Sequence, residues 1–349
     1  MPLVVGLACL LSACGEPSPP TPPAPPVAAP VSPERSASAF RWRSAPETVA
    51  HDVPWELIQR GIPVPDPRDR IPALLAPRFV SVAEASHVRA TDRVLVVVSG
   101  DDARAYPVRL LDAHELVNDV VGGVPLLVTW CPLCLSAIVF ERRVAGEVRT
   151  FGVSGYLYRS AVLMYDHASE SFWSQIAGRA VAGPLTGTHL VRRPVDVTSF
   201  AAFRAAHPAG QVLGPEQEGR SPEDYLHEHY ADYQARAGLM FQVDAYDARL
   251  KLKDEVLGVV RPGGAHAWSM EHVRALPAGP QAVEVLGERL WLEHDPGADT
   301  VRVLGSDGQP VPSLRCYWFA WFAFHPATGL TGGSATPSAG TEAQPKDGR

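Results

Sequence analysis

Short apolar runs separated by turn residues dominate the middle of the chain. Residues 93–98 (RVLVVV) are almost wholly β-branched or apolar, and Ser99-Gly100-Asp101-Asp102 follows them as a turn. Runs of this length, bounded by Gly and Asp, are typical of β-strands in hairpins. The pattern predicts strands at residues 93–98, 103–108, 124–130, 135–143 and 148–153, and the aromatic run at 317–324 predicts a further buried strand.

Three segments carry helical signals instead. Apolar residues at helical spacing end at Gly61, and the capping-box pattern Ser81-Val82-Ala83-Glu84 indicates a helix start. Helices are therefore predicted at residues 41–60, 81–90 and 110–119.

An internal similarity suggests how these elements are organised. Residues 92–107 align without gaps on residues 254–269, with identical residues at seven of 16 positions, among them Asp92/Asp254 and Val94/Val256. The alternative is that two β-hairpins merely share composition. We predict an α+β, β-rich fold of antiparallel sheets with short helices, in two related lobes at about residues 71–215 and 240–330.

The first residues resemble an export signal. Residues 3–11 are apolar, and Leu11-Ser12-Ala13 places small residues directly before Cys14, as signal peptidases for bacterial lipoproteins require. An ordinary secretory signal or a short buried segment is the alternative. We predict a signal peptide at 1–13, a lipidated Cys14 that begins a Pro-rich tether to residue 40, a globular domain at 41–330 and a disordered tail at 331–349. The protein would then be held on the extracytoplasmic side of a membrane by lipid on Cys14.

Charge and cysteine count exclude some functions. The formal charge is −7, with 31 Lys and Arg against 38 Asp and Glu and no basic block, which argues against binding to nucleic acid. Beyond Cys9 and Cys14, three cysteines remain, Cys131, Cys134 and Cys316. An odd number in an oxidising compartment is not typical of a fold held together by disulfides.

Cys131 and Cys134 are the main candidates for chemistry, because two thiols at this spacing can form a disulfide, bind a metal or cycle between redox states. Pro132 restricts the backbone between them, so both sulfurs are expected in one tight turn. On the predicted helix 110–119, His114 could keep one cysteine ionised, and Asn118 or Asp119 could orient it. The leading hypothesis is thiol–disulfide exchange with an unknown thiol or disulfide partner.

Two other functions use the same residues differently. Cys131 and Cys134 with His114 or Cys316 could bind Cu(I) or Zn²⁺ in a metal carrier. A permanent disulfide in a non-catalytic surface binding module is the other possibility. Covalent haem is disfavoured because Leu135, rather than His, follows Cys134.

Several segments of the chain resemble a widespread bacterial family, domain of unknown function 3179. They are ARAYPVRLLDAHELVND (103–119), GGVPLLVTWCPLCLSAIVF (122–140), TFGVSGYLYRSAVLMYD (150–166), and residues 170–175 and 317–328. The resemblance implies no settled activity. Because some members of that family carry selenocysteine where Cys131–Cys134 stand, it does imply redox use of the pair. Trp130 stands where that family leads us to expect Tyr, and His227 and His229 are also unexpected.

Overall fold

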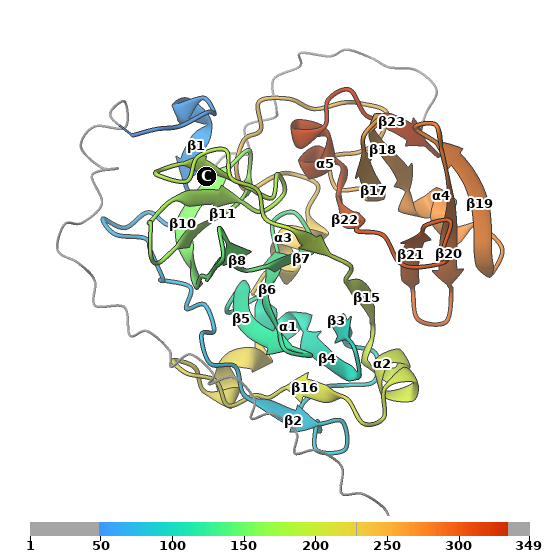
Figure 1. Ribbon diagram of the computed structural model, residues 1–349, viewed down its shortest axis with the longest axis horizontal. Helices are drawn as coiled ribbons and strands as arrows, with labels where there is room; N and C mark the ends of the chain where they lie inside the picture. Colours follow the sequence, from blue (N-terminus) through green and yellow to red (C-terminus); the bar gives the residue numbers. More distant parts are fainter. Residues whose placement is uncertain (1–48, 228, 334–349) are drawn as a thin grey trace, which may run out of the picture. The chain divides into compact units, whose positions relative to one another are not determined.

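The computed structural model describes residues 49–227 and 229–333, which are mostly β-structure, with 41% strand and 13% helix (Figure 1). Five sheets of three to five strands and one two-stranded ribbon account for the strands of these residues. The predicted signal peptide, the whole of the predicted tether and nearly all of the predicted tail lie outside the described residues.

Three sheets contain most of the first part of the chain. The first has the order β1 (Ile58–Arg60), β10 (Phe151–Tyr158), β11 (Ala161–Asp166), β12 (Phe172–Ser174) and β13 (Arg179–Ala182). The second has the order β14 (Arg192–Arg193), β7 (Ser136–Glu141), β6 (Val124–Cys131) and β5 (Leu116–Val121). The third has the order β15 (Asp196–Ser199), β3 (Arg93–Ser99), β4 (Asp102–Pro107), β16 (Gln211–Leu213) and β2 (Phe79–Ser81).

The later strands form two more sheets. One has the order β22 (Leu314–Tyr317), β17 (Glu255–Arg261), β18 (Gly264–Ser269) and β23 (Gly329–Thr331). The other has the order β19 (Gly279–Val285), β20 (Glu288–Asp295) and β21 (Thr300–Leu304), and β8 (Arg143–Val144) pairs separately with β9 (Glu147–Val148).

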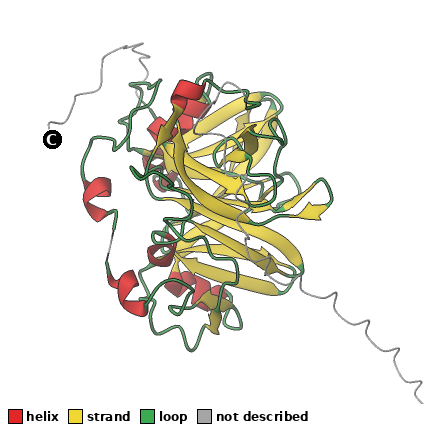
Figure 2. Ribbon diagram, turned by 90° about the vertical axis from the view of Figure 1, so that its left-hand side faces the viewer, coloured by secondary structure: helices red, strands yellow, loops and turns green. Residues whose placement is uncertain are grey.

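In the part of the chain that the structure describes, the helices are few and short beside the strands (Figure 2). They are the 3₁₀ helices η3 (Trp55–Leu57) and η4 (Pro222–Leu226) and the α-helices α1 (Val108–Leu111), α2 (Phe200–Ala206), α3 (Ala231–Ala235), α4 (Met270–Arg274) and α5 (Trp318–Phe324).

The expectation of an α+β fold with two related lobes is wrong. The chain is mostly β, and its five sheets are arranged like the blades of a five-bladed β-propeller. The two similar segments do form hairpins of equal register, because Val94 pairs with Pro107 as Val256 pairs with Ser269. The main hydrophobic cluster, however, includes buried residues from both parts of the chain, although smaller clusters lie wholly within residues 82–212 and 257–303.

The predicted helices also need correction. Residues 110–119 begin as the last turn of α1 but continue into β5, whose residues pair with β6 from Leu116↔Thr129 onward. Ser81 and Glu84 make the predicted capping hydrogen bonds, at 3.0 and 3.3 Å, yet residues 82–92 form turns rather than a helix. Within residues 49–60 only η3 is helical, and β1 follows it.

The aromatic run at 317–324 is a helix rather than the predicted strand. Only Tyr317 belongs to β22, and α5 begins at Trp318. Five of the seven residues of α5 are buried, so the helix has no polar face from which its period could be read. By contrast, the predicted strands at 93–98, 103–108 and 124–130 are confirmed as β3, β4 and β6 within one or two residues at each end.

Candidate functional site: a buried pair of cysteines

Cys131 and Cys134 lie in the turn between β6 and β7, which we call the cysteine loop (residues 131–136). Cys131 is the last residue of β6 and pairs with Ser136, the first residue of β7. The Cys134 N–H donates to the Cys131 carbonyl at 3.2 Å, and Leu135 has a left-handed φ of 53°. The prediction that both thiols occupy one tight turn between two strands is therefore confirmed.

The cysteine loop is buried, and a third cysteine lies beside it. The exposed fraction is 1% for Cys131 and 0% for Cys134 and Cys316, and all three thiols are free. Cys316 comes from β22, where the N–H of the next residue, Tyr317, donates to the Cys134 carbonyl at 2.9 Å. Tertiary structure thus brings together cysteines that are far apart in the sequence.

The two thiols of the cysteine loop differ in how readily they ionise. Burial opposes ionisation of Cys131, but the neighbouring Cys134 side chain and backbone N–H groups, including that of Val162, lower the pKa of Cys131. The Cys134 thiol itself donates to the Ser160 carbonyl at 3.3 Å. Burial and the nearby Cys131 sulfur raise the pKa of Cys134 well above its ordinary value. Burial also raises the pKa of Cys316. Cys131 is therefore the thiol that the site favours as the thiolate.

His114 binds groups other than the sulfurs. Its Nδ1 lies 2.7 Å from the Pro72 carbonyl and its Nε2 lies 2.6 Å from the Tyr225 hydroxyl. Because a carbonyl can only accept, Nδ1 carries the proton and Nε2 accepts from Tyr225. Burial lowers the pKa of His114 to about 4, which matches a neutral ring. Both ring nitrogens are engaged, so the structure does not bring His114 to the cysteines as a base or a metal ligand.

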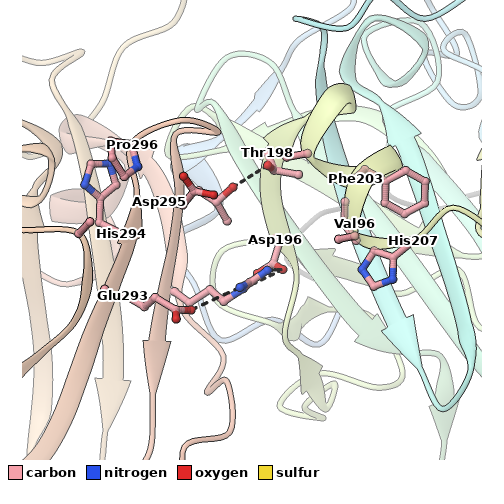
Figure 3. Close-up of a pocket in the computed structure, with 15 residues that line it drawn as sticks. Val96, Asp196, Thr198, Phe203, His207, Glu293, His294, Asp295 and Pro296 are labelled. Atoms are coloured by element: carbon pink, nitrogen blue, oxygen red, sulfur yellow. Dashed lines mark hydrogen bonds and ion pairs between the residues drawn. The ribbon is translucent and has the colours of Figure 1, made fainter.

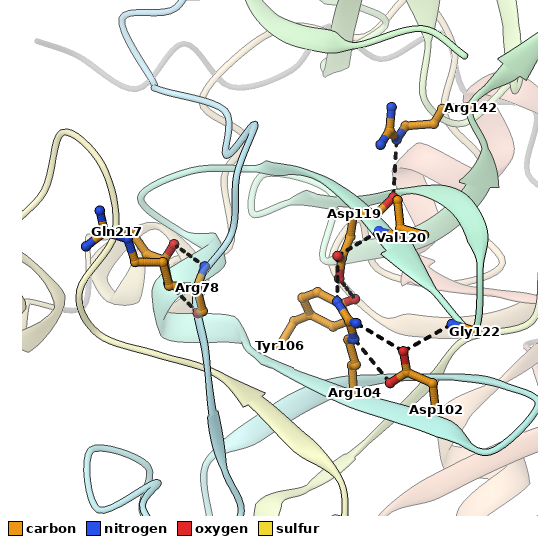
Figure 4. Close-up of polar contacts among 9 residues, drawn as sticks. All are labelled: Arg78, Asp102, Arg104, Tyr106, Asp119, Val120, Gly122, Arg142 and Gln217. Carbon is orange, nitrogen blue, oxygen red and sulfur yellow. Dashed lines mark hydrogen bonds and ion pairs between the residues drawn. The ribbon is translucent and has the colours of Figure 1, made fainter. Parts of the chain in front are cut away.

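Asn118 and Asp119 lie on β5 and make contacts that connect strands. The Phe151 N–H donates to Asn118 Oδ1 at 2.8 Å, and Asn118 Nδ2 donates to the Phe151 carbonyl at 2.9 Å. Asp119 accepts from Arg104 and from the Tyr106 hydroxyl, each at 2.6 Å (Figure 4). These contacts explain why both polar side chains are buried, and they direct the two side chains to partners other than the sulfurs.

Glu115 is the residue that sequence reasoning did not select. Its exposed fraction is 6%, its φ of 57° is left-handed, and among the described residues its carboxyl has no hydrogen bond or ion pair. Burial and the nearby Cys131 sulfur raise its pKa well above the ordinary value. It lines an apolar cavity of about 100 Å³ together with Leu133 and Val162. Glu115 is recognised as a candidate site residue only by its burial and its left-handed backbone, and the sequence reveals neither.

Replacing Glu115 with glutamine is expected to change how stability depends on pH. A carboxyl with a raised pKa contributes fully to stability below its ordinary value of 4.5, and that contribution is lost as pH rises through the raised pKa. Between pH 4.5 and the raised pKa, the free energy of unfolding of the wild type should fall by roughly 1.4 kcal/mol per pH unit because of this group. Urea denaturation at about pH 4, 6 and 8 should show Glu115→Gln gaining stability relative to the wild type as pH rises. A difference that does not vary with pH would show that Glu115 is ionised in the fold.

Gln175 connects the two strands that carry the cysteine loop. Its Oε1 accepts from Ser136 Oγ and its Nε2 donates to Thr129 Oγ1, each at 2.9 Å. All three side chains are buried, with Thr129 on β6 and Ser136 on β7. This satisfied polar network stabilises the base of the hairpin on which the sulfurs are presented.

Helix α3 and the residues around it cover the cysteine loop. The Tyr233 hydroxyl donates to the Leu133 carbonyl inside the loop at 2.9 Å, and Lys253 Nζ lies 3.5 Å from the centroid of the Tyr233 ring. Tyr230, directly before α3, lines the same apolar cavity as Glu115. The sulfurs are therefore buried partly by their own sheet and partly by this covering segment.

Metal ligands do not gather here. Within residues 49–227 and 229–333, no group of three or more His, Cys, Asp or Glu side chains is arranged to bind a metal ion. Since both nitrogens of His114 have other partners, the Cu(I) or Zn²⁺ alternative finds no third ligand in that residue.

A cavity of about 410 Å³ lies elsewhere, with residues of β15, β20 and β21 in its wall (Figure 3). Arg302 spans it, paired with Asp196 at 2.6 Å and with Glu293 at 3.3 Å, and the Thr300 hydroxyl donates to Thr198 at 2.5 Å. None of the predicted site residues lines this cavity.

The fold and the site define a mostly β protein that buries a Cys-x-x-Cys pair in a hairpin turn. The chain belongs to the family described as protein of unknown function DUF3179, whose model matches residues 68–328. Comparisons with curated proteins and with solved structures gave no match. No helix of the part of the chain that the structure describes is long and apolar enough to cross a membrane.

Proposed function

We propose that the protein carries out thiol–disulfide exchange through Cys131 and Cys134. The observation that supports this most strongly is the pair of free thiols in one hairpin turn, of which one has a lowered and the other a raised pKa. Exchange needs a thiolate as nucleophile and a second thiol nearby to release the product, and these two residues supply both.

The reaction balances with a small disulfide as the oxidant. The Cys131 thiolate attacks one sulfur of that disulfide, a bond forms between them, and the other half leaves as a thiolate. The Cys134 thiol then gives up its proton to a departing thiolate and attacks the Cys131 sulfur. A Cys131–Cys134 disulfide forms, the second half of the oxidant leaves as a thiolate, and two electrons pass from the protein to the oxidant.

Glu115 contributes to this proposal through its protonation. Burial and the nearby Cys131 sulfur raise the pKa of Glu115 well above its ordinary value, which favours the neutral carboxyl beside the Cys131 thiolate. An ionised Glu115 would repel the thiolate and make it harder to form.

The burial of both sulfurs sets a requirement for exchange. Cys131 is 1% exposed, so a partner reaches its sulfur only when the cysteine loop or the covering helix α3 opens. The hydrogen bond from Tyr233 to Leu133 is one contact that must break. Opening of such a segment without global unfolding is an ordinary local fluctuation.

We also propose that the protein is exported and anchored by lipid on Cys14, outside the cytoplasm. Support comes from the apolar residues 3–11, the small residues before Cys14 and the Pro-rich segment after it. Outside the cytoplasm the environment is oxidising, so a disulfide between Cys131 and Cys134 can form and persist there.

A redox titration tests the proposal. The protein, purified without reductant, is equilibrated in glutathione buffers of stepwise potential, and its thiols are counted by alkylation and mass spectrometry. We expect a Cys131–Cys134 disulfide with a potential of about −120 to −230 mV. A bond that remains closed below about −300 mV would be structural and would contradict the proposal. An added metal mass with both thiols reduced would support the carrier function instead.

A further inference from the structure

A second cavity beside the cysteine loop has a charged wall. It has a volume of about 350 Å³, and Trp130 and Leu135, the residues that flank the cysteine pair, line it together with Tyr317. Arg93 and Glu255 also line it, and these are equivalent positions of the two similar hairpins. We call it the Arg93 cavity. Its size is within the range of small-molecule sites.

Arg93 is the unusual group in this wall. It begins β3 and is half-buried, yet among residues 49–227 and 229–333 its guanidinium makes no hydrogen bond or ion pair. Placing a charge in a partly buried position without a partner is costly, so such groups normally have a counter-ion. An arginine presents several N–H donors in a planar fork that fits a carboxylate.

The other charged groups of the wall do not neutralise Arg93, since each carboxylate already has a partner. Asp92 pairs with Arg89 at 2.7 Å, Glu255 pairs with Arg315 at 2.6 Å, and Asp112 accepts from the Trp130 indole N–H at 2.7 Å. Arg109, also in the wall, donates to the His87 carbonyl at 2.6 Å and pairs with Asp92 at 3.7 Å, while its Nε has no hydrogen-bond partner among the described residues. Among the described residues, the Arg93 guanidinium and the Nε of Arg109 are therefore donors without a partner, whereas every carboxylate of the wall has one.

We propose that the Arg93 cavity binds a small disulfide or thiol that carries a carboxylate, with the carboxylate paired to Arg93. This inference rests on the proposed exchange function and names the class of its partner. A ligand held there lies next to Trp130 and Leu135, the two residues that flank the segment carrying Cys131 and Cys134. The aromatic walls formed by Trp130 and Tyr317 accommodate the apolar part of such a compound.

Equilibrium binding to the full chain tests the proposal without relying on turnover. The protein with both Cys131→Ser and Cys134→Ser, which cannot react, is titrated with dithiodiglycolate by calorimetry. The neutral bis(2-hydroxyethyl) disulfide is the comparison ligand. We expect dithiodiglycolate to bind and the neutral disulfide to bind at least about tenfold more weakly, because a charge-assisted pair to arginine is lost.

Variants then assign the binding to Arg93. In the same background, Arg93→Gln should weaken dithiodiglycolate binding about tenfold or more, and Arg93→Lys should restore part of it. Arg289→Gln is the matched control, because Arg289 is an exposed arginine of β20 outside the cavity, and it should change nothing. Thermal unfolding of each variant verifies the fold.

Two results would overturn the inference: no binding of dithiodiglycolate, or equal binding to the Arg93→Gln protein. Failure of the exchange function is a separate result, seen in the redox titration as a bond that stays closed. If dithiodiglycolate binding depends on Arg93 but the Cys131–Cys134 disulfide stays closed in the redox titration, the Arg93 cavity binds anions but has no role in exchange.

Discussion

Replacing Cys131 with serine is expected to abolish disulfide exchange, reducing the rate with dithiodiglycolate to the uncatalysed background. Cys131 is the thiol whose ionisation the hydrogen bonds of the cysteine loop favour, while burial keeps Cys134 protonated. Serine preserves the size of the side chain but supplies no thiolate.

The Cys134→Ser protein should behave differently. It retains the first nucleophile but lacks the thiol that releases the product, so a mixed disulfide on Cys131 should accumulate. Mass spectrometry of protein quenched with acid would detect the added thioglycolate. Cys316→Ser is the matched control, because Cys316 is also a buried free thiol near the pair yet is not needed in the proposed steps. A Cys131→Ser protein that exchanges at the wild-type rate would contradict the assignment.

Replacing Asp119 with alanine should destabilise the fold by about 3–5 kcal/mol without changing the redox potential of the cysteine pair. The Asp119 carboxylate is the acceptor for Arg104, for the Tyr106 hydroxyl and for the Val120 N–H. Tyr106 is fully buried, so its hydroxyl would have no acceptor once the carboxylate is removed. The free energy of unfolding in urea measures the loss.

Asp101→Ala is the matched control for this change. Asp101 is an exposed residue in the turn between β3 and β4, and its removal should alter stability by no more than about 0.5 kcal/mol. If Asp119→Ala were as stable as the wild type but inactive in exchange, Asp119 would have the orienting role that its sequence position suggested, and the structural interpretation would fail.

Hairpins were the part of the fold that sequence reasoning recovered best. Residues 93–107 combine two apolar runs with the turn Ser99-Gly100-Asp101-Asp102, and both strands are observed with the expected turn between them. Such a signal is local, because adjacent strands pair across a few residues whatever the rest of the chain does.

The segment 110–119 shows where local reasoning fails. Its residues have adequate helix propensity, and α1 does begin at Val108. Pairing of Leu116 and the following residues with β6 overrides that propensity, and the left-handed φ of Glu115 marks the change of direction. The predicted helix 110–119 therefore assigned the wrong element type to Asn118, which lies on β5.

The sequence by itself determined the cysteine hairpin, the similarity of the two hairpins and membership of the family, because all three depend on residues close together or on direct comparison of letters. Only tertiary structure decided that His114 binds Tyr225, that Asn118 and Asp119 connect strands, and that Cys316 lies beside the pair. Tertiary structure also decided that the side chains of Glu115 and Arg93 have no hydrogen-bond or ion-pair partner among the described residues. The physical reason is that burial and pairing of a polar group depend on segments far along the chain, which no local pattern specifies.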